Sequence, residues 1–346
     1  MSDIQNDLID TVDRVCDAQC TRALRDAAEQ GEWPAALWDA FEELGLVRAL
    51  LPEDAGGSAL DFDDAMAVLR RCAWHAVPLP LAETLLAGRL LMSAGLAVPE
   101  GALAVAPPPA DVLRISAQGR VSGRVAHVPW GERCEHVVLV GQGEGGAFIG
   151  VAATAGCVVA ADRSLAGEPR ATLVFEAAPL LSMAPFEGGV DRLWAEGALV
   201  RSVQMAGALE RVLAWSLQYA NERVQFGKPI GKFQAVQHML AVLAGQVAAA
   251  SAVADLAVQA SVLQADGFAV AAAKARIGEA AGKGAEIAHQ VHGAMGFTQE
   301  HSLHYSSRRL WAWREEFGNE SFWQLRLARM VAARGADALW PMVTAV

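Results

Sequence analysis

Cysteine is scarce in this chain, and its few cysteines are scattered. Five occur among 346 residues, namely Cys16, Cys20, Cys72, Cys134 and Cys157. No two of them have the Cys-x-x-Cys spacing of redox and metal motifs, and a disulfide scaffold needs more cysteines in a shorter chain. We therefore expect reduced thiols, most of them buried.

Positive charge and long apolar runs are also in short supply. The chain carries 28 lysines and arginines against 39 aspartates and glutamates, for a net charge of −11. Phosphate backbones are bound by basic patches, so this balance argues against a nucleic-acid partner. Residues 1–20 lack a basic-then-apolar secretion signal, and no run approaches the roughly 18 apolar residues that span a bilayer. These absences predict a cytoplasmic protein without a membrane span.

The sequence patterns predict three domains. Residues 1–100 have helical periodicity, residues 101–185 break into short β-like runs, and residues 186–346 are helical again and rich in alanine. The expected strands are 112–115, 120–127, 137–140, 148–151 and 171–175, and the expected long helices are 191–222, 233–264 and 267–292, with more helix beyond Leu303. Short turns between long helices favour an antiparallel bundle. The predicted fold class is α+β, mainly α: an N-terminal helical domain, a small middle β-sheet or barrel, and a C-terminal four-helix bundle.

The stretch 223–237 links two of the expected helices. Apolar residues at three- and four-residue steps predict that both helices face a core; they are Met205, Leu209, Val212, Leu213 and Leu217 upstream and Val236, Leu240, Leu243 and Val247 downstream. Gly227, Pro229 and Gly231 end the first helix and shape the turn. Arg223, Lys228 and Lys232 concentrate positive charge there, so the loop suits an anionic ligand.

Two motifs in this half resemble the acyl-CoA dehydrogenase family. Arg223, Phe226 and Gly227 match the family's Arg-x-x-Phe-Gly turn, which grips the diphosphate of FAD bound largely to a neighbouring subunit. The second motif, Gln-x-x-Gly-Gly-x-Gly, is matched by residues 290–296, with Ala294 in place of one glycine. The cofactor-binding residues that the resemblance implies are Arg223, Phe226, Gly227, Gln234, Gln290, Gly293 and Gly296.

A third similarity lies near the N-terminus, and each match also has a plainer interpretation. Residues 43–58, with the turn Pro-Glu-x-x-Gly-Gly, are similar to the family's N-terminal helical domain.

The residues of the first two motifs have a second interpretation that involves no cofactor. In it, Arg223 is a cation that complements a helix C-terminus, Phe226 is a core residue, and Gly293 and Gly296 only end a helix. The resemblance is strongest over 205–320 and weakest over 101–185.

The family's reaction needs a carboxylate base to remove the α-proton of an acyl-CoA thioester. Aligning glycines in the family's Tyr-Glu-Gly-Thr-type turn puts Phe317 at the position of the base, with Glu316 beside it. Other members carry the base on the helix before the Arg-x-x-Phe-Gly turn; counting back reaches Gly197, with Glu196 beside it. Glu316 and Glu196 are therefore the candidate catalytic residues, and the alternative is that both are ordinary surface acids.

The strand region departs from the family pattern. The family's flavin-holding loop has no counterpart between Ala106 and Arg114, and its Trp-x-Thr strand lacks a clean match near Trp130. We interpret the chain as an acyl-CoA dehydrogenase subunit that shares FAD with a paralogous subunit in a hetero-oligomer. The alternatives are a non-catalytic partner subunit, a self-sufficient homo-oligomer, and a helical scaffold that has lost nucleotide binding.

The resemblance also suggests a substrate class and an electron acceptor. Residues 296–309 look like a bacterial branch of the family with hetero-oligomeric members, associated with steroid- or ring-derived acyl-CoA esters. We hypothesise that the small residues Ala206, Gly207 and Ala208 leave room for a bulky ring. The family suggests an electron-transfer flavoprotein as acceptor.

Four histidines invite a metal-site interpretation, but their spacing does not favour one. They form two i, i+3 pairs, His289 with His292 and His301 with His304. Helical zinc sites typically pair histidines at i, i+4 with a nearby carboxylate. We expect no metal, and His292, close to the dinucleotide motif, is of most interest.

Overall fold

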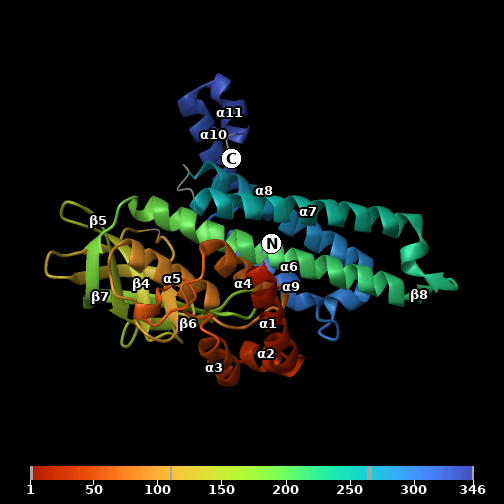
Figure 1. Cartoon of the computed structure of the whole chain (residues 1–346), viewed down its shortest axis with the longest axis horizontal. Helices are drawn as coiled ribbons and strands as arrows, with labels where there is room; N and C mark the ends of the chain where they lie inside the picture. The colour runs from red at the N-terminus through yellow and green to blue at the C-terminus, as the bar shows by residue number, and fades with distance from the viewer. Residues whose placement is uncertain (1–2, 110, 263–266, 345–346) are drawn as a thin grey trace. The chain divides into compact units, whose positions relative to one another are not determined.

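A computed structural model describes residues 3–109, 111–262 and 267–344 (Figure 1). The helices are α1 Asp3–Gln19, α2 Arg22–Glu29, α3 Ala35–Glu43, α4 Phe62–Trp74, α5 Leu81–Ser93, α6 Gly189–Glu222, α7 Gln234–Val262, α8 Phe268–His292, α9 Leu303–Glu315, α10 Glu320–Arg334 and α11 Leu339–Thr344. Along the chain, the strands of a sheet lie between α5 and α6. The expected fold class, α+β and mainly α, is confirmed.

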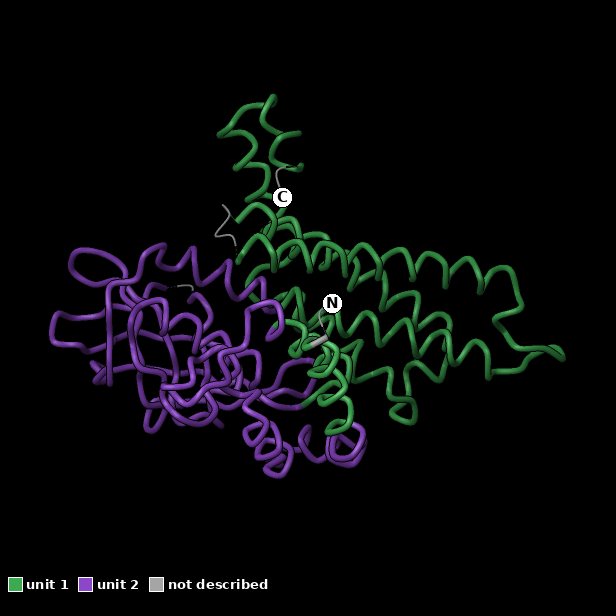
Figure 2. Tube along the Cα trace, viewed as in Figure 1, with its two compact units in different colours: residues 1–16, 66–77, 201–346 green, residues 17–65, 78–200 purple. Residues whose placement is uncertain are grey.

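The chain divides into two compact units, drawn in different colours in Figure 2. The first combines residues up to Cys16 and Met66–Val77 with the chain from Arg201 onward. The second contains Asp17–Ala65 and Pro78–Val200. The three domains expected from the sequence stay an interpretation, since this division groups segments by compactness alone.

The second unit contains a sheet that closes on itself. Its strands are β1 Leu103–Val105, β2 Arg114–Ile115, β3 Arg120–Pro129, β4 His136–Gly143, β5 Gly146–Ala153, β6 Val158–Arg163 and β7 Pro169–Pro185. Pairing runs β4–β2–β3–β7–β5 and returns from β5 to β4, which makes a small barrel, while β1 adds to β4 and β6 to β7. β1 and β2 pair with β4 in parallel, so the sheet is mixed rather than purely antiparallel.

Two strands of the sheet, β1 and β6, were not expected from the sequence, and β7 is longer than expected. β6 is exposed along its whole length and therefore lacks the apolar–polar alternation that marks a half-buried strand. β1 has only three residues, and all are buried. β7 was expected over 171–175, but it continues to Pro185 because its second half pairs with β5. Long-range pairing therefore decided the extent of these strands.

The segment before β2 is held tightly against the barrel. The Leu113 carbonyl accepts a hydrogen bond from the Gln142 amide at 2.7 Å. The Leu113 side chain is buried over Gly123, where an added Cβ would lie 2.8 Å from Leu113 Cδ2. At Gly141 an added Cβ would lie 2.8 Å from the Leu113 oxygen. Both glycines thus let this segment pack directly on the strands.

Close helix contacts in the first unit depend on glycine. An added Cβ at Gly284 of α8 would lie 2.7 Å from a Leu209 methyl group of α6 and 3.4 Å from one of Leu243 in α7, so the three helices meet there. At Gly207 the added Cβ would lie 2.1 Å from the Arg70 carbonyl oxygen of α4. The hypothesis that small residues here leave room for a bulky substrate is therefore wrong at Gly207, because backbone fills the space.

Several apolar residues of this unit are not covered by their own chain. Met205, Leu209 and Val212 are buried as predicted, but Leu217, near the end of α6, is exposed. α7 is long and apolar enough to cross a membrane by length and composition, contrary to our expectation, and 33% of its most apolar window is buried. Asp255 and Ser251 on α7 nevertheless bond to Arg70 and Glu210, so part of the helix has polar partners within the unit.

Candidate functional site

A β-hairpin with a two-residue turn follows α6 and carries the first predicted cofactor motif. Val224–Gln225 (β8) pairs with Lys228–Pro229 (β9), so Phe226 and Gly227 form the connecting turn. Their φ angles are +51° and +77°, the left-handed values that a type I′ turn requires at both central residues. Glycine adopts this geometry freely, but phenylalanine is strained there. The loop expected from the sequence is therefore a tight, defined turn.

The hairpin presents its motif side chains to the outside. Phe226 is 93% exposed and makes an edge contact with Phe233 at 6.1 Å between ring centroids. Arg223, Lys228 and Lys232 are also exposed, and the Lys228 ammonium lies 4.5 Å from the Phe233 ring centroid. The alternative that Phe226 is a core residue is wrong. An exposed aromatic ring on a hairpin flanked by exposed cations is a surface suited to the base and diphosphate of a nucleotide.

The second motif lies where α8 ends. Gly293, at φ +59° and ψ −139°, is the C-cap, and its amide bonds to the His289 carbonyl. Gly296 is buried, and an added Cβ there would lie 3.0 Å from His292 Cβ. Gly293 therefore does end the helix, and Gly296 allows the following turn to close on it. Gln290 is exposed on the last turn of α8, and Gln234 is exposed at the start of α7.

One stacked pair brings the two motifs together. Tyr219, one turn before Arg223, stacks on His292, one residue before Gly293, with ring centroids 4.6 Å apart. At Gly227 and Gly293 no described residue beyond the chain neighbours comes within 4 Å of an added Cβ, so the backbone is open to close approach. The exposed cations, open glycine backbone and uncovered ring fit the diphosphate and adenosine half of FAD.

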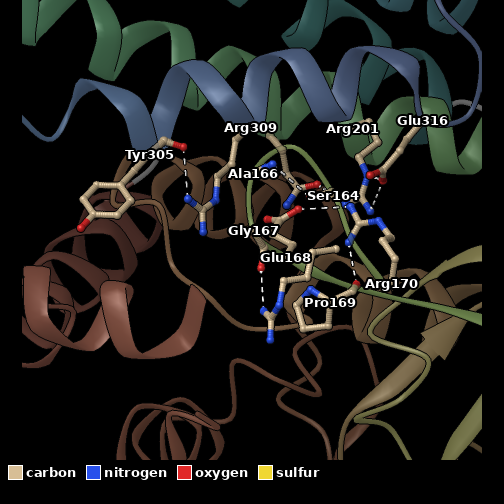
Figure 3. A network of polar contacts seen from close by, with 12 residues as sticks. Ser164, Ala166, Gly167, Glu168, Pro169, Arg170, Arg201, Tyr305, Arg309 and Glu316 are labelled. Carbon is tan, nitrogen blue, oxygen red and sulfur yellow. Dashed lines mark hydrogen bonds and ion pairs between the residues drawn. The ribbon is translucent and has the colours of Figure 1, made fainter. Parts of the chain in front are cut away.

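The first candidate base, Glu316, is held by a buried arginine. Its carboxylate lies 2.7 Å from Arg201 Nε, and Figure 3 shows the two side chains pointing toward one another. Arg201 also donates to the Gln204 amide oxygen at 2.5 Å. Phe317, at the aligned position of the base, is buried with φ +51°. Glu316 thus acts as the counter-ion of a buried cation.

A buried lysine holds the same turn. Lys274 of α8 is 0% exposed and donates to the carbonyls of Arg314 at 2.8 Å and Gly318 at 2.6 Å. Burial lowers the pKa of Lys274 to about 7, although the negative charge of Glu316 opposes this shift. Trp323 Nε1 donates to the Phe317 carbonyl at 2.8 Å. The carbonyls of this turn are therefore bonded from two sides.

The second candidate base, Glu196, is also engaged by arginine. Its carboxylate lies 2.8 Å from Arg89 Nε of α5 and 3.8 Å from Arg192 Nε, one turn earlier on α6. The residue is buried. The interpretation of Glu196 and Glu316 as ordinary surface acids does not describe them, because both are partners of charged side chains within the fold.

Trp130 belongs to the barrel core. It follows β3 with φ +59°, is buried, and makes an edge contact with Trp33 at 6.3 Å between ring centroids. This location agrees with the missing Trp-x-Thr match, because the ring packs inside its own unit.

Among the described residues, no group of three or more histidine, cysteine, aspartate or glutamate side chains has metal-binding geometry. Sequence reasoning missed Arg201, Lys274 and Tyr219 as parts of the site. For Lys274 a signal was available, because it directly follows the run Ala271–Ala273 and precedes Ala275 on a helix expected in a bundle.

Comparison with known proteins places the chain in a family. Residues 2–96 match the acyl-CoA dehydrogenase N-terminal domain and residues 193–331 its C-terminal domain. The chain is 33% identical over 291 residues to acyl-CoA dehydrogenase IpdE2 of Mycobacterium tuberculosis, and the match covers 82% of each. Its fold is similar to that in the ChsE4-ChsE5 complex from Mycobacterium tuberculosis, with TM-score 0.89 and 23% identity over 97% of this chain and 99% of that one. It is also similar to a variant of the Tcur3481-Tcur3483 steroid ACAD, with TM-score 0.88 and 23% identity over 95% and 98%. The chain therefore belongs to the acyl-CoA dehydrogenase family of FAD-dependent oxidoreductases, as its motifs predicted.

Proposed function

We propose that this chain is one subunit of a cytoplasmic hetero-oligomeric acyl-CoA dehydrogenase and shares FAD with a paralogous subunit. The enzyme would remove hydrogen from the α and β carbons of an acyl-CoA thioester, with bound FAD supplying the hydride acceptor. This chain contributes Arg223, Phe226 and Gly227 on the hairpin, Gln234, and Gln290, Gly293 and Gly296 at the end of α8.

The exposure of Phe226 is the observation that carries this proposal. Phe226 is 93% exposed in a strained left-handed turn, and its edge contact with Phe233 covers little of the ring. Burial against a nucleotide and a second subunit would explain both the strain and the exposure. The exposed Leu217 and the uncovered part of α7 support a partner next to the same helices.

The barrel supports sharing rather than a complete FAD site in this chain. The family's flavin-holding loop is absent here, and Leu113 instead packs on Gly123 and Gly141. The ion pairs of Glu316 and Glu196 support the same division of labour, since a base must approach the substrate's α-carbon. We therefore assign the base to the partner; if this chain completes a site of its own, Glu316 and Glu196 are its proposed bases.

We propose a steroid- or ring-type acyl group, with electrons passing to an electron-transfer flavoprotein. Support comes from residues 296–309, which resemble the branch associated with such substrates, and from a structural neighbour described as a steroid ACAD. The backbone packed against Gly207 excludes a substrate ring at that position, but it does not argue against a ring-type acyl group elsewhere in the site.

The test is the visible absorption spectrum, flavin stoichiometry and mass of the protein, purified alone and after co-expression with an acyl-CoA dehydrogenase paralogue encoded beside it. We expect a colourless chain alone and a yellow complex with about one FAD for every two chains. Arg223→Ala should remove flavin from that complex, while Arg124→Ala, at an exposed barrel arginine, should not. A yellow homo-oligomer with one FAD per chain would contradict the sharing proposal.

A further inference from the structure

Four rings pack together at the ends of α6 and α8, and we name them the aromatic clasp: Trp215, Tyr219, His292 and His301. Tyr219 stacks on His292 at 4.6 Å between centroids, with the planes 25° apart. His301 meets His292 at 4.6 Å, Trp215 at 5.3 Å and Tyr219 at 5.9 Å. The clasp thus joins two helices and the segment between α8 and α9.

Each side of the clasp is bonded directly to one cofactor motif. The Arg223 amide donates to the Tyr219 carbonyl at 2.8 Å, and the Arg223 carbonyl accepts from the Ile230 amide at 2.8 Å across the hairpin. His292 precedes the Gly293 cap, and Gly296 packs against its Cβ. The Tyr219–His292 stack is therefore linked through the backbone to the hairpin and to the turn after α8.

His292 has the properties of a support rather than of a ligand. It is 2% exposed, so it is covered by its own chain. Its Nδ1 lies 2.8 Å from the Ala288 carbonyl, which only accepts, so Nδ1 carries the proton. Burial lowers the pKa of His292 to about 4, and the ring stays neutral near pH 7. Stacking therefore holds it to Tyr219 without a charge.

We infer that Tyr219 and His292 are positioning residues, which hold the Arg223 hairpin and the Gly293 turn at the spacing that the diphosphate and adenosine half of FAD requires. This inference rests on the proposed function, because it assumes that both motifs contact the same dinucleotide. Truncating either ring would let the two motifs move independently, so that fewer binding contacts form together.

The test compares His292→Ala with His292→Phe in the co-expressed complex, stripped of flavin and titrated with FAD. We expect the alanine variant to raise the FAD dissociation constant about tenfold or more, and the phenylalanine variant, which keeps a stacking ring, to restore it to within about threefold. His75→Ala is the matched control, because His75 is also a buried histidine but its ring is bonded to Asp13 of α1. It should lower thermal stability with little change in FAD affinity.

Tyr219→Leu provides a second variant in case His292→Ala does not fold, and it should weaken FAD binding similarly. On the chain alone, hydrogen exchange of the Ile230 amide should accelerate in both variants, because the hairpin loses its support. Unchanged FAD affinity in folded His292→Ala or Tyr219→Leu, with affinity lost in Arg223→Ala, would overturn the positioning role alone. Unchanged affinity in Arg223→Ala would overturn the shared site itself.

Discussion

Arg201 Nε lies 2.7 Å from the carboxylate of Glu316, and the two residues are separated by 115 positions in the chain. The arginine is buried, so the carboxylate compensates a charge that the fold has removed from water. In the turn where the family resemblance suggested a catalytic base, Glu316 neutralises a buried cation.

Glu316→Gln should therefore affect stability more than catalysis. In the complex we expect the turnover number to stay within about threefold. The free energy of unfolding of the chain should fall by about 2 kcal/mol, because the substitution removes the carboxylate that is paired with the buried Arg201. Glu196→Gln should behave similarly, through Arg89. Steady-state kinetics and denaturant unfolding measure both effects. A drop of about 10²–10⁴-fold in turnover for either variant would instead identify that glutamate as the base.

Phe226→Ala should separate cofactor sharing from folding. Because the ring is 93% exposed, its removal should change the chain's unfolding free energy by less than about 0.5 kcal/mol. Flavin should nevertheless be lost from the complex, measured by the ratio of absorbance near 450 nm to that at 280 nm. Phe233→Ala is a less suitable comparison because Phe233 also contacts Lys228. Full flavin retention in Phe226→Ala would refute the role of this ring.

Gly207→Ala and Gly245→Ala form a matched pair of mid-helix substitutions. At Gly207 the new Cβ would lie 2.1 Å from the Arg70 carbonyl oxygen, so we expect a loss of about 2 kcal/mol or more as α4 and α6 separate. At Gly245 no other part of the described chain comes within 4 Å of an added Cβ, so alanine should stabilise α7 by about 0.5–1 kcal/mol. Thermal and denaturant unfolding of the isolated chain test both, and a neutral Gly207→Ala would contradict the close crossing.

The contact between α1 and α4 should weaken in acid. Asp13 accepts hydrogen bonds from Arg71 at 2.7 Å and lies 2.8 Å from His75 Nε2. Burial lowers the pKa of His75 below 6.5, although Asp13 opposes the shift. Burial would raise the pKa of Asp13, but the hydrogen bonds and charges of Arg71 and His75 outweigh it, and the net shift is downward from 3.8.

Both pKa values are lower in the folded chain than in the unfolded chain, so both residues make the fold less stable in acid. The unfolded chain protonates His75 near pH 6.5 and Asp13 near 3.8, before the folded chain does, so stability is lost as pH falls through each window. We expect unfolding free energy to decrease from pH 7 to 5 in the wild type and to decrease less in His75→Gln. His238→Gln, at an exposed histidine, should leave the wild-type profile unchanged. Equal profiles in all three proteins would contradict the assignment.

Lys274 should make the free energy of unfolding depend on pH above about pH 7. Its pKa is lowered by burial from 10.5 to about 7, so between these values the unfolded chain binds the proton that the folded chain has released. Stability should therefore rise with pH from about 7 toward 10. Lys274→Met should remove part of this rise, as measured by urea unfolding at pH 7, 8 and 9. An identical slope in the variant would assign the rise to other groups.

Local patterns explain why the helices and the turn after α6 were predictable. The apolar steps at Met205, Leu209 and Val212 report one buried helix face, and the spacing of Arg223, Phe226 and Gly227 is contained in one turn. The pattern failed at Leu217 because its own chain does not cover the end of α6. It also failed at β7, whose second half depends on pairing with β5.

By itself the sequence determined the fold class and the family, because both depend on residue types at short, regular spacing. Only the tertiary structure decided that Phe226 faces outward, that Gly207 admits backbone rather than substrate, and that Glu316 and Glu196 are each paired with an arginine. It also decided that Tyr219 and His292 join the two motifs. These facts depend on which residues distant in the chain become neighbours, and packing sets that choice through shape, burial and charge compensation.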